Sequence, residues 1–401
     1  MDWQSSEDTV AVRPVTDAEV RLLSGKPPAS GAWREGDPVG DRRFAAIGAL
    51  TTEAGVRIPG VRVAYESWGR LDADGGNAVL VLHALTGDPH LTGPAGPGQP
   101  TDGWWEGVVG PGLALDTDRW FVVAPNVLGG CAGTTGPASL APDQSEWGGR
   151  FPYVTIRDQV AAQAAFADTI GITRFAAVVG GSMGGMHALE WAVGLPERVA
   201  RLAVLAAPGS SSADQIALNS VQTEAVRADP RFRGGDYYGA ADGDGPYRGL
   251  ALARRMALLN YRSQSELNER FGRSWQSGVS PLGHHGRFAV ESYLDFHGNR
   301  FTRRFDANSY IRLVDAMSSH DIGRGRGGVE AALRAFTGPA LVLGIDSDRL
   351  YPIEDQRRIA PHLSGAIDGP EPTLLESHFG HDGFLIEREA IGSALRRLLD
   401  V

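Results

Sequence analysis

The segment around Ser182 has the residue types and spacing of a catalytic nucleophile. It places a serine in a Gly-x-Ser-x-Gly arrangement, with Gly180 before it and Gly184 after it. The apolar run Phe175–Val179 precedes this arrangement, and the helical pattern Met183–Val193 follows it. In such an elbow a strand turns into a helix within a few residues, so only glycines fit beside the strained serine. We predict a nucleophilic serine here, with a Gly-rich turn such as a phosphate loop as the alternative.

A serine nucleophile needs a histidine base and an acid that orients the histidine, in the chain order serine, acid, histidine. Asp348 follows the apolar run Ala340–Ile345, at the sheet edge where catalytic groups gather. His381 follows the next apolar run and lies in a glycine-flanked loop that opens a helix. We predict that His381 removes the serine proton and that Asp348 orients the imidazole. Asp346 and His378 are the neighbouring alternatives.

The same chemistry needs backbone donors for the negative oxygen of the intermediate. One donor is the amide N–H after the nucleophile, here Met183, and the other comes from the loop after an early strand. The run Ala78–Ala84 is such a strand, so we predict Leu85 as the second donor. His83 is interpreted as a structural support of that loop.

Composition excludes several other kinds of site. The net charge of −10 argues against a nucleic-acid partner, and no apolar run of about 18 residues predicts a membrane span. Cys131 is the only cysteine, so neither an intrachain disulfide nor a Cys-rich metal site is possible, and we expect it to be packed in a Gly-rich loop. Lys26 lies in no Schiff-base, P-loop or Ser–Lys context. We therefore expect neither a metal nor a cofactor. The acidic start Met1–Val10 is unlike a secretory signal, and a cytoplasmic location is expected.

Apolar runs alternate with helical patterns along most of the 401 residues, which predicts an α/β fold with a mostly parallel, doubly wound sheet and helices on both faces. We expect a flexible leader over residues 1–40, a first part of the core over 41–209, a helical lid insertion over 210–325 and the rest of the core over 326–401. A separate small helical domain is the alternative for the insertion. The expected strands are Val61–Trp68, Ala78–Ala84, Phe121–Pro125, Phe175–Val179, Leu202–Ala207, Ala340–Ile345 and Thr373–Glu376. The expected helices are Ile156–Thr169, Met183–Val193, Ala213–Arg227, Gly249–Tyr261, Phe288–Phe296, Asn308–Ser318, Glu354–Leu363 and Phe384–Leu399.

Several strings of residues, taken together, resemble the homoserine O-acetyltransferase family of the α/β-hydrolase fold. They cover the chain from about residue 40 to its end: His83–Asp88, Gly103–Trp105, Asn126–Pro137, Gly180–Gly185, Val290–Asp295, Arg304–Tyr310, Asp346–Pro352 and Gly380–Phe384. The Met186-His187 pair after the elbow departs from the typical family version, and we expect it to face the helix rather than the reacting atoms.

The resemblance implies a two-step reaction in which Ser182 takes an acetyl group from acetyl-CoA and the hydroxyl of L-homoserine then takes it from the serine. It also implies two substrate contacts, Arg254 for the carboxylate and Asp382 for the ammonium group, which matches the need of a zwitterion for one fixed cation and one fixed anion. Arg255 is the neighbour that could be mistaken for Arg254. Tyr261 lies at helical spacing from Arg254; we expect it to serve core packing, with a place in the pocket lining as the alternative.

The resemblance further implies a homodimer through the helical insertion and a role in methionine biosynthesis. Three alternative functions stay open: transfer from a succinyl donor, transfer to a serine acceptor, and hydrolysis by a plain serine esterase. The serine, histidine and aspartate are common to all of them.

Overall fold

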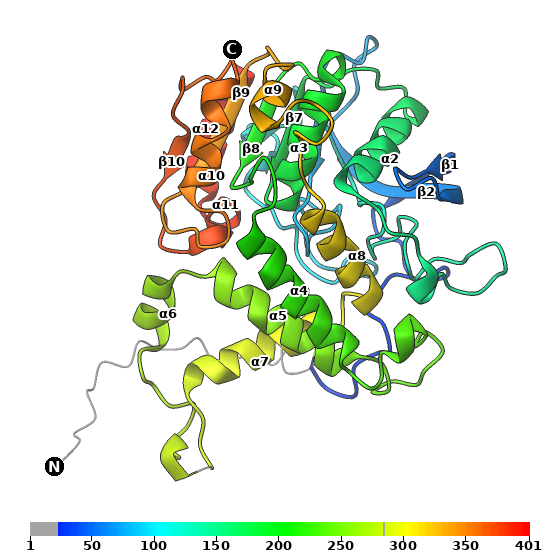
Figure 1. Ribbon diagram of the computed structural model, residues 1–401, viewed down its shortest axis with the longest axis vertical. Coiled ribbons are helices and arrows are strands. Elements are labelled where there is room, and N and C mark those ends of the chain that lie inside the picture. The colour runs from blue at the N-terminus through cyan, green and yellow to red at the C-terminus, as the bar shows by residue number, and fades with distance from the viewer. Residues whose placement is uncertain (1–22, 284) are drawn as a thin grey trace.

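The computed structural model describes residues 23–283 and 285–401. Its centre is an eight-stranded sheet in the order β1-β2-β6-β3-β7-β8-β9-β10 (Figure 1). Strand β2 pairs antiparallel with β1 and β6, and the strands from β6 to β10 are parallel. The strands are β1 (Arg43–Thr51), β2 (Arg57–Trp68), β3 (Ala78–Leu82), β6 (Phe121–Pro125), β7 (Ala177–Gly181), β8 (Leu202–Leu205), β9 (Ala340–Ile345) and β10 (Thr373–Leu375).

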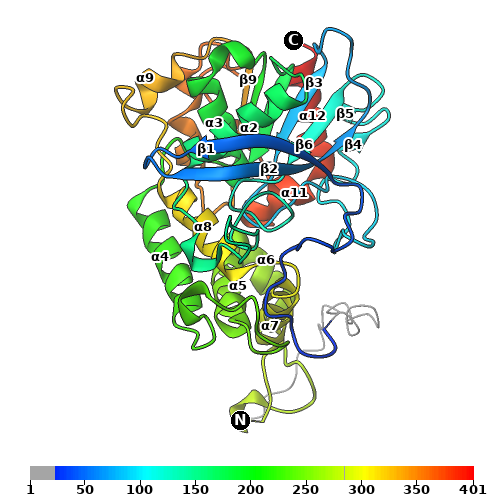
Figure 2. The ribbon, with the colours of Figure 1, turned by 90° about the vertical axis from the view of Figure 1, so that its right-hand side faces the viewer.

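The parallel strands are buried on both faces. Every residue of β3, β7, β8 and β9 is buried, as expected for apolar runs covered by helices on each side. Leu80 and Val178 pack with α2 (Ile156–Thr169) and α3 (Met183–Gly194). Their chain neighbours Val79 and Val179 pack with α12 (Arg388–Leu399) on the opposite face. Figure 2 shows α2 and α3 on one side of the strands and α12 on the other.

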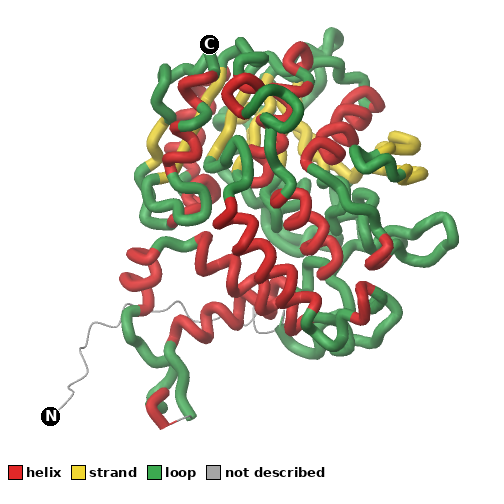
Figure 3. Tube along the Cα trace, in the orientation of Figure 1, coloured by secondary structure: helices red, strands yellow, loops and turns green. Residues whose placement is uncertain are grey.

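A run of helices between β8 and β9 gathers at one end of the sheet (Figure 3). We call it the helical insertion. It comprises α4 (Ala213–Arg227), α5 (Tyr247–Tyr261), α6 (Gln264–Phe271), α7 (Ala289–Phe301) and α8 (Ala307–Ser318). The short α9 (Val329–Leu333) follows α8 in the chain but packs against α3, away from these helices (Figure 1). The exact domain limits at 210 and 325, and the function of the insertion as a lid, stay predictions.

The structure contains elements that the sequence patterns did not predict. These are β1, α6, α9 and the short strands β4 (Val109–Gly110) and β5 (Leu115–Asp116). Strand β1 is an edge strand with register shifts around Gly48, and most of its residues are not buried although residues 44–50 are apolar or glycine.

Two predicted helices are interrupted. The helix expected over Glu354–Leu363 ends as α10 (Ile353–Arg357), and a 3-10 turn over Ala360–His362 follows it with Pro361 near its start. Proline lacks the N–H that an α-helix interior needs. The helix expected over Phe384–Leu399 is divided at Glu387 into α11 (Gly383–Ile386) and α12. None of the helices in the described part of the chain is long and apolar enough to cross a membrane.

The expected leader over residues 1–40 is described only from residue 23, and residues 1–22 lie outside the described part. Residues 23–40 contain no helix or strand, but they are packed against the body of the protein rather than free. Gly31 donates its amide N–H to the carbonyl of Phe305 at 3.2 Å, and Trp33 donates to the carbonyl of Cys131 at 2.9 Å. These backbone hydrogen bonds attach the segment to the protein at Gly31 and Trp33, and the flexibility expected for residues 1–40 stays a prediction.

Asp306 connects this segment to the helical insertion. Its carboxylate is fully buried and accepts hydrogen bonds from Ser30 Oγ, Tyr237 Oη, Tyr238 Oη and the amide of Ser309, at 2.7 to 2.9 Å. Burial and the Asp306 charge raise the pKa of both tyrosines well above 10, so the phenols stay protonated and can donate.

Asp306→Ala is expected to destabilise the protein by about 3 kcal/mol or more, because it leaves buried hydroxyl donors without an acceptor and removes the cap of α8. Urea unfolding followed by circular dichroism measures the change. Asp242→Ala, at an exposed position, is the control and should shift the free energy of unfolding by less than about 0.5 kcal/mol. Equal stability of the two variants would contradict the role given to Asp306.

Candidate active site

Ser182 occupies a sharp turn between β7 and α3. Its backbone has φ +57° and ψ −125°, a strained conformation for a residue with a side chain. The turn brings backbone segments so close that a Cβ at Gly180 would lie 2.0 Å from the carbonyl oxygen of Gly184. A Cβ at Gly184 would lie 2.0 Å from the carbonyl oxygen of Leu82 in β3. Gly180 is therefore required by the tightness of the turn itself, and Gly184 by the contact of the turn with the neighbouring strand.

The three residues predicted as nucleophile, base and acid meet at the carboxyl edge of the sheet. His381 Nε2 lies 2.8 Å from Ser182 Oγ, and His381 Nδ1 lies 2.6 Å from Asp348 Oδ2. Asp348 follows β9 and His381 follows β10, and all three side chains are buried. With Nδ1–H donating to the carboxylate, Nε2 is left to accept the serine proton.

Asp348 is itself fixed by the backbone. Its Oδ1 accepts from the amides of Leu350 at 2.8 Å and Tyr351 at 3.0 Å, which leaves Oδ2 for His381. Burial alone would lower the pKa of His381. The Asp348 charge and hydrogen bond, with a further effect of Asp382, outweigh burial and raise the pKa above its ordinary value. The carboxylate therefore stabilises the imidazolium form.

The alternative residues lie elsewhere. Asp346 Oδ1 accepts from the amide of Ser377 at 3.0 Å and so joins the ends of β9 and β10. His378 is exposed, and its ring packs against Phe379 with ring centroids 4.0 Å apart. The structure thus brings together Ser182 with His381 and Asp348, and neither Asp346 nor His378.

Two backbone donors lie beside the serine. Among the described residues, neither the amide N–H of Leu85 nor that of Met183 has a hydrogen-bond acceptor. Buried N–H groups without partners are rare, and a pair of them next to a nucleophile is suited to a negative oxygen. Met183 also begins α3, whose positive end favours negative charge.

The His83 ring holds the loop that contains Leu85. Its Nδ1–H donates to the carbonyl of Ala84 at 2.8 Å, and its Nε2 accepts the amide N–H of Val127 at 3.2 Å. Burial lowers the pKa of His83, so the neutral ring can donate at one nitrogen and accept at the other. These contacts agree with the interpretation of His83 as a structural support.

A cavity of about 180 Å³ opens at Ser182 and His381. Arg254 and Asp382, the two residues implied as substrate contacts, both line it. Arg254 Nη1 lies 3.4 Å from Thr86 Oγ1 and has no carboxylate partner among the described residues. Asp382 Oδ2 lies 3.3 Å from Arg262 Nε. The cavity therefore presents a cation and an anion beside the nucleophile.

Arg255, the neighbour of Arg254 in sequence, has a different environment. Its Nη1 lies 2.9 Å from Asp295 Oδ1, and Arg255 does not line the Ser182 cavity. The two adjacent arginines thus differ in what they face, which makes them a matched pair for mutation.

Two further residues line the cavity. Tyr261 packs against the buried cluster of the insertion, as expected, and also lines the cavity, which was the alternative; its ring centroid is 5.7 Å from that of His381. Arg304 donates from Nη1 to the carbonyl of Thr86 at 2.9 Å. Burial and the neighbouring charge of Arg254 lower the pKa of Arg304 to about 10. Arg304 lies in one of the family-like strings, but no spacing in the sequence indicated that it would reach Ser182.

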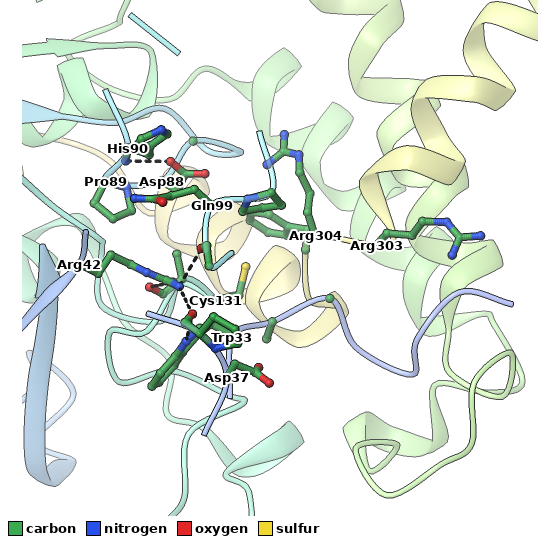
Figure 4. A pocket seen from close by; sticks show the side chains of 18 of the residues that line it. Trp33, Asp37, Arg42, Asp88, Pro89, His90, Gln99, Cys131, Arg303 and Arg304 are labelled. Atoms are coloured by element: carbon green, nitrogen blue, oxygen red, sulfur yellow. Dashed lines mark hydrogen bonds between the residues drawn. The ribbon is translucent and has the colours of Figure 1, made fainter. Parts of the chain in front are cut away.

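A second, larger cavity of about 350 Å³ adjoins the first (Figure 4). Gly87 and Arg304 line both cavities. Cys131 also lines the larger one, where burial and the Asp306 charge raise the pKa of its thiol to about 12. In the described part of the chain, no three His, Cys, Asp or Glu side chains gather in a way that could hold a metal ion.

Comparisons with known proteins agree with this geometry. A family described as "alpha/beta hydrolase fold" matches residues 77–387. The chain is 73% identical to a homoserine O-acetyltransferase of Clavibacter michiganensis subsp. michiganensis, over 96% of this chain and 99% of the relative. It is 57% identical to a homoserine O-acetyltransferase of Thermobifida fusca, over 93% of this chain and 97% of the relative.

Among solved structures, a homoserine O-acetyltransferase from Bacillus anthracis is similar with a TM-score of 0.80 and 26% identity, over 90% of this chain and 97% of that one. Esterase E22 is similar with a TM-score of 0.80 and 27% identity, over 89% of this chain and 99% of that one. The fold is thus shared with both a transferase and an esterase, but the sequence relatives at 57% and 73% identity are homoserine O-acetyltransferases. The chain belongs to the homoserine O-acetyltransferase family of the α/β-hydrolase fold.

Proposed function

We propose that this protein transfers an acetyl group from acetyl-CoA to the side-chain hydroxyl of L-homoserine, a reaction of methionine biosynthesis. The observation that supports it best is the position of Arg254 and Asp382 in the same cavity as Ser182 and His381. A reaction with water needs no such pair, whereas an amino acid acceptor does.

In the first step, Ser182 Oγ attacks the thioester carbon while His381 Nε2 takes its proton. The carbonyl oxygen becomes negative and accepts from the amides of Leu85 and Met183. The C–S bond then breaks, and His381 returns the proton to the sulfur, so CoA leaves as a thiol and an acetyl-serine remains. Asp348 stays ionised throughout and stabilises the imidazolium.

In the second step, the homoserine hydroxyl gives its proton to His381 as its oxygen attacks the acetyl carbon. The bond to Ser182 Oγ breaks and the serine regains a proton from His381. Arg254 binds the homoserine carboxylate, Arg304 adds a second positive charge, and Asp382 binds the ammonium group. Fixing both ends of the zwitterion orients its hydroxyl toward the acyl-enzyme.

A serine esterase is the second candidate, because proteins named as esterases share the fold at a TM-score of 0.80. It would use the same first step and then transfer the acetyl group to water. Succinyl-CoA as donor and L-serine as acceptor are the variants within the transferase proposal.

We also propose a homodimer through the helical insertion and a cytoplasmic location. Support for the dimer comes from exposed apolar side chains on two helices of the insertion, Ile216 and Val221 on α4 and Leu252 and Leu259 on α5. The mass of the protein in solution tests the dimer. The cytoplasmic location is supported by the single cysteine, because proteins of reducing compartments do not depend on disulfide bonds.

Release of free CoA by the purified protein tests the proposed function. With acetyl-CoA, release is expected to depend on L-homoserine and to fall by at least about a thousandfold in Ser182→Ala, because the nucleophile is lost. L-serine and an acceptor-free reaction are the comparisons. Release at an equal rate without acceptor would make the protein a hydrolase. Activity with succinyl-CoA alone would change the donor and keep the mechanism.

The pH profile reports the charge of His381. The base must be neutral, so kcat/KM for acetyl-CoA should fall as the pH decreases through a pKa above 6.5, since Asp348 raises that pKa. Asp348→Asn removes the charge and leaves burial to act alone. Its profile should therefore move to lower pH, with a rate about 10⁴-fold smaller. An unmoved profile in this variant would contradict the pairing.

Replacement of Arg254 separates acceptor binding from acylation. Arg254→Met should lower kcat/KM for homoserine by about 10- to 100-fold, the cost of one lost charged hydrogen bond. Acylation by p-nitrophenyl acetate should stay within about twofold, because it involves no amino acid. Arg255→Met is the matched control and should leave both rates near those of the unmodified protein. A loss of acylation in Arg254→Met would show that the residue supports the fold instead.

A further inference from the structure

The Asp382 carboxylate has a cationic neighbour outside the serine cavity. Its Oδ2 lies 3.3 Å from Arg262 Nε, and both side chains are mostly buried, with 17% of the Asp382 surface and 15% of the Arg262 surface exposed. Asp382 lines the serine cavity, whereas Arg262 does not. The arginine therefore acts on the carboxylate from outside the space that a substrate would occupy.

The backbone fixes the position of Arg262 relative to Asp382. Arg262 ends α5 in an extended conformation, and Ser263 begins α6 as its N-terminal cap. Ser263 Oγ also donates to the carbonyl of His378, in the loop that contains Asp382. A Cβ on Gly380 would lie 2.7 Å from the amide nitrogen of Ser263, so this loop and the junction of the two helices are in direct backbone contact.

The other side of the Arg262 guanidinium faces a second carboxylate. Arg262 Nη1 lies 3.8 Å from Glu266 Oε1, and Arg270 Nη1 lies 3.5 Å from the same oxygen. Burial alone would lower the pKa of Arg262, but Asp382, with further effects of Tyr293 and Glu266, outweighs burial and raises that pKa. Arg262 is therefore a charged residue held between two carboxylates.

The contact between Arg262 and Asp382 is an ion pair without a hydrogen bond. Among the described residues, Arg262 Nε has no hydrogen-bond partner, and the Asp382 carboxylate accepts no hydrogen bond. An ionised carboxylate has about four acceptor sites. Those of Asp382 are thus open to an ammonium group that enters the cavity.

Asp382 and Arg254 face one cavity without pairing. Arg254 has no carboxylate partner among the described residues, and its Cζ lies 5.3 Å from the ring centroid of Tyr261. Burial raises the pKa of Tyr261, while Arg254 opposes that rise and Asp382 adds to it, so the ring lies near both charges. Opposite charges that are shielded from water attract each other strongly. A direct pair between them would leave neither charge available for a zwitterion.

We propose that Arg262 is a positioning residue of the acceptor site. Its guanidinium holds the Asp382 carboxylate from outside the cavity and keeps it away from Arg254, so that an anion and a cation stay available for the two ends of the amino acid. This inference rests on the proposed function, because it assigns Asp382 to the ammonium group of the acceptor.

Arg262→Met tests the proposal, because it removes the charge and keeps most of the length of the side chain. The Asp382 carboxylate is then left without its partner and turns toward Arg254, where it competes with the substrate. The KM for L-homoserine is expected to rise by about tenfold or more. The KM for acetyl-CoA and the acylation burst with p-nitrophenyl acetate should stay within about threefold, because neither involves an amino acid.

Arg262→Lys and Arg270→Met are the two comparison variants. The lysine keeps a positive charge beside Asp382, so the KM for homoserine should return to within about threefold of the value for the unmodified protein. Arg270 shares Glu266 with Arg262 but forms no ion pair with Asp382 among the described contacts. Arg270→Met should therefore leave all of these values near those of the unmodified protein.

A double-mutant cycle with Asp382→Asn separates positioning from general support of the fold. Because Arg262 acts through the Asp382 carboxylate, Arg262→Met should change kcat/KM for homoserine by less than about twofold in Asp382→Asn protein. A structural role would give the same loss in both backgrounds, and that result would overturn the proposal.

An unchanged KM for homoserine in Arg262→Met would also overturn the proposal. So would an equal loss of acylation by p-nitrophenyl acetate, which would assign Arg262 to the support of His381 instead. Failure of the proposed function gives a different result, in which the unmodified protein itself releases no CoA in response to homoserine.

Discussion

The hydrogen bond between Ser182 and His381 joins residues 199 positions apart, and the rest of the site depends on that contact. Neither residue can reach the other unless β7, β8, β9 and β10 pair in that order, with their carboxyl ends at one edge. The full burial of β7 and β9 supplies the rigidity that a 2.8 Å contact requires. The sheet thus fixes the positions of the three side chains, which lie in the turns that follow its strands.

Much of the site was predictable because its residues stand in short, recognisable stretches of sequence. The elbow needs glycine at two positions for steric reasons, and those glycines are visible in the sequence. Asp348 and His381 follow apolar runs, and parallel strands place such residues together. The choice of Asp348 over Asp346 depends on which carboxylate points toward His381, and the structure shows Asp346 bonded to the amide of Ser377 instead.

Other features were not predictable because they arise from contacts between distant segments. Arg304 reaches the serine cavity only because the end of α7 packs beside the loop around Thr86. Tyr261 has the spacing of a core residue, and its position at the cavity depends on how α5 meets the turn of His381. Strand β1 has apolar residues over 44–50, but most of them are not buried, and its place in the sheet depends on pairing with β2, which comes later in the chain.

The carboxylate of Asp306 accepts from Ser30, a residue 276 positions earlier in the chain. The larger cavity lies between these two regions, so its walls come from both the beginning and the later part of the sequence. During synthesis the segment around Ser30 leaves the ribosome long before its acceptor exists. Closure of such a long loop is entropically costly. A nascent chain that has produced the first strands of its sheet therefore still lacks one wall of this cavity, and the serine site also waits for Asp348 and His381, which follow α8.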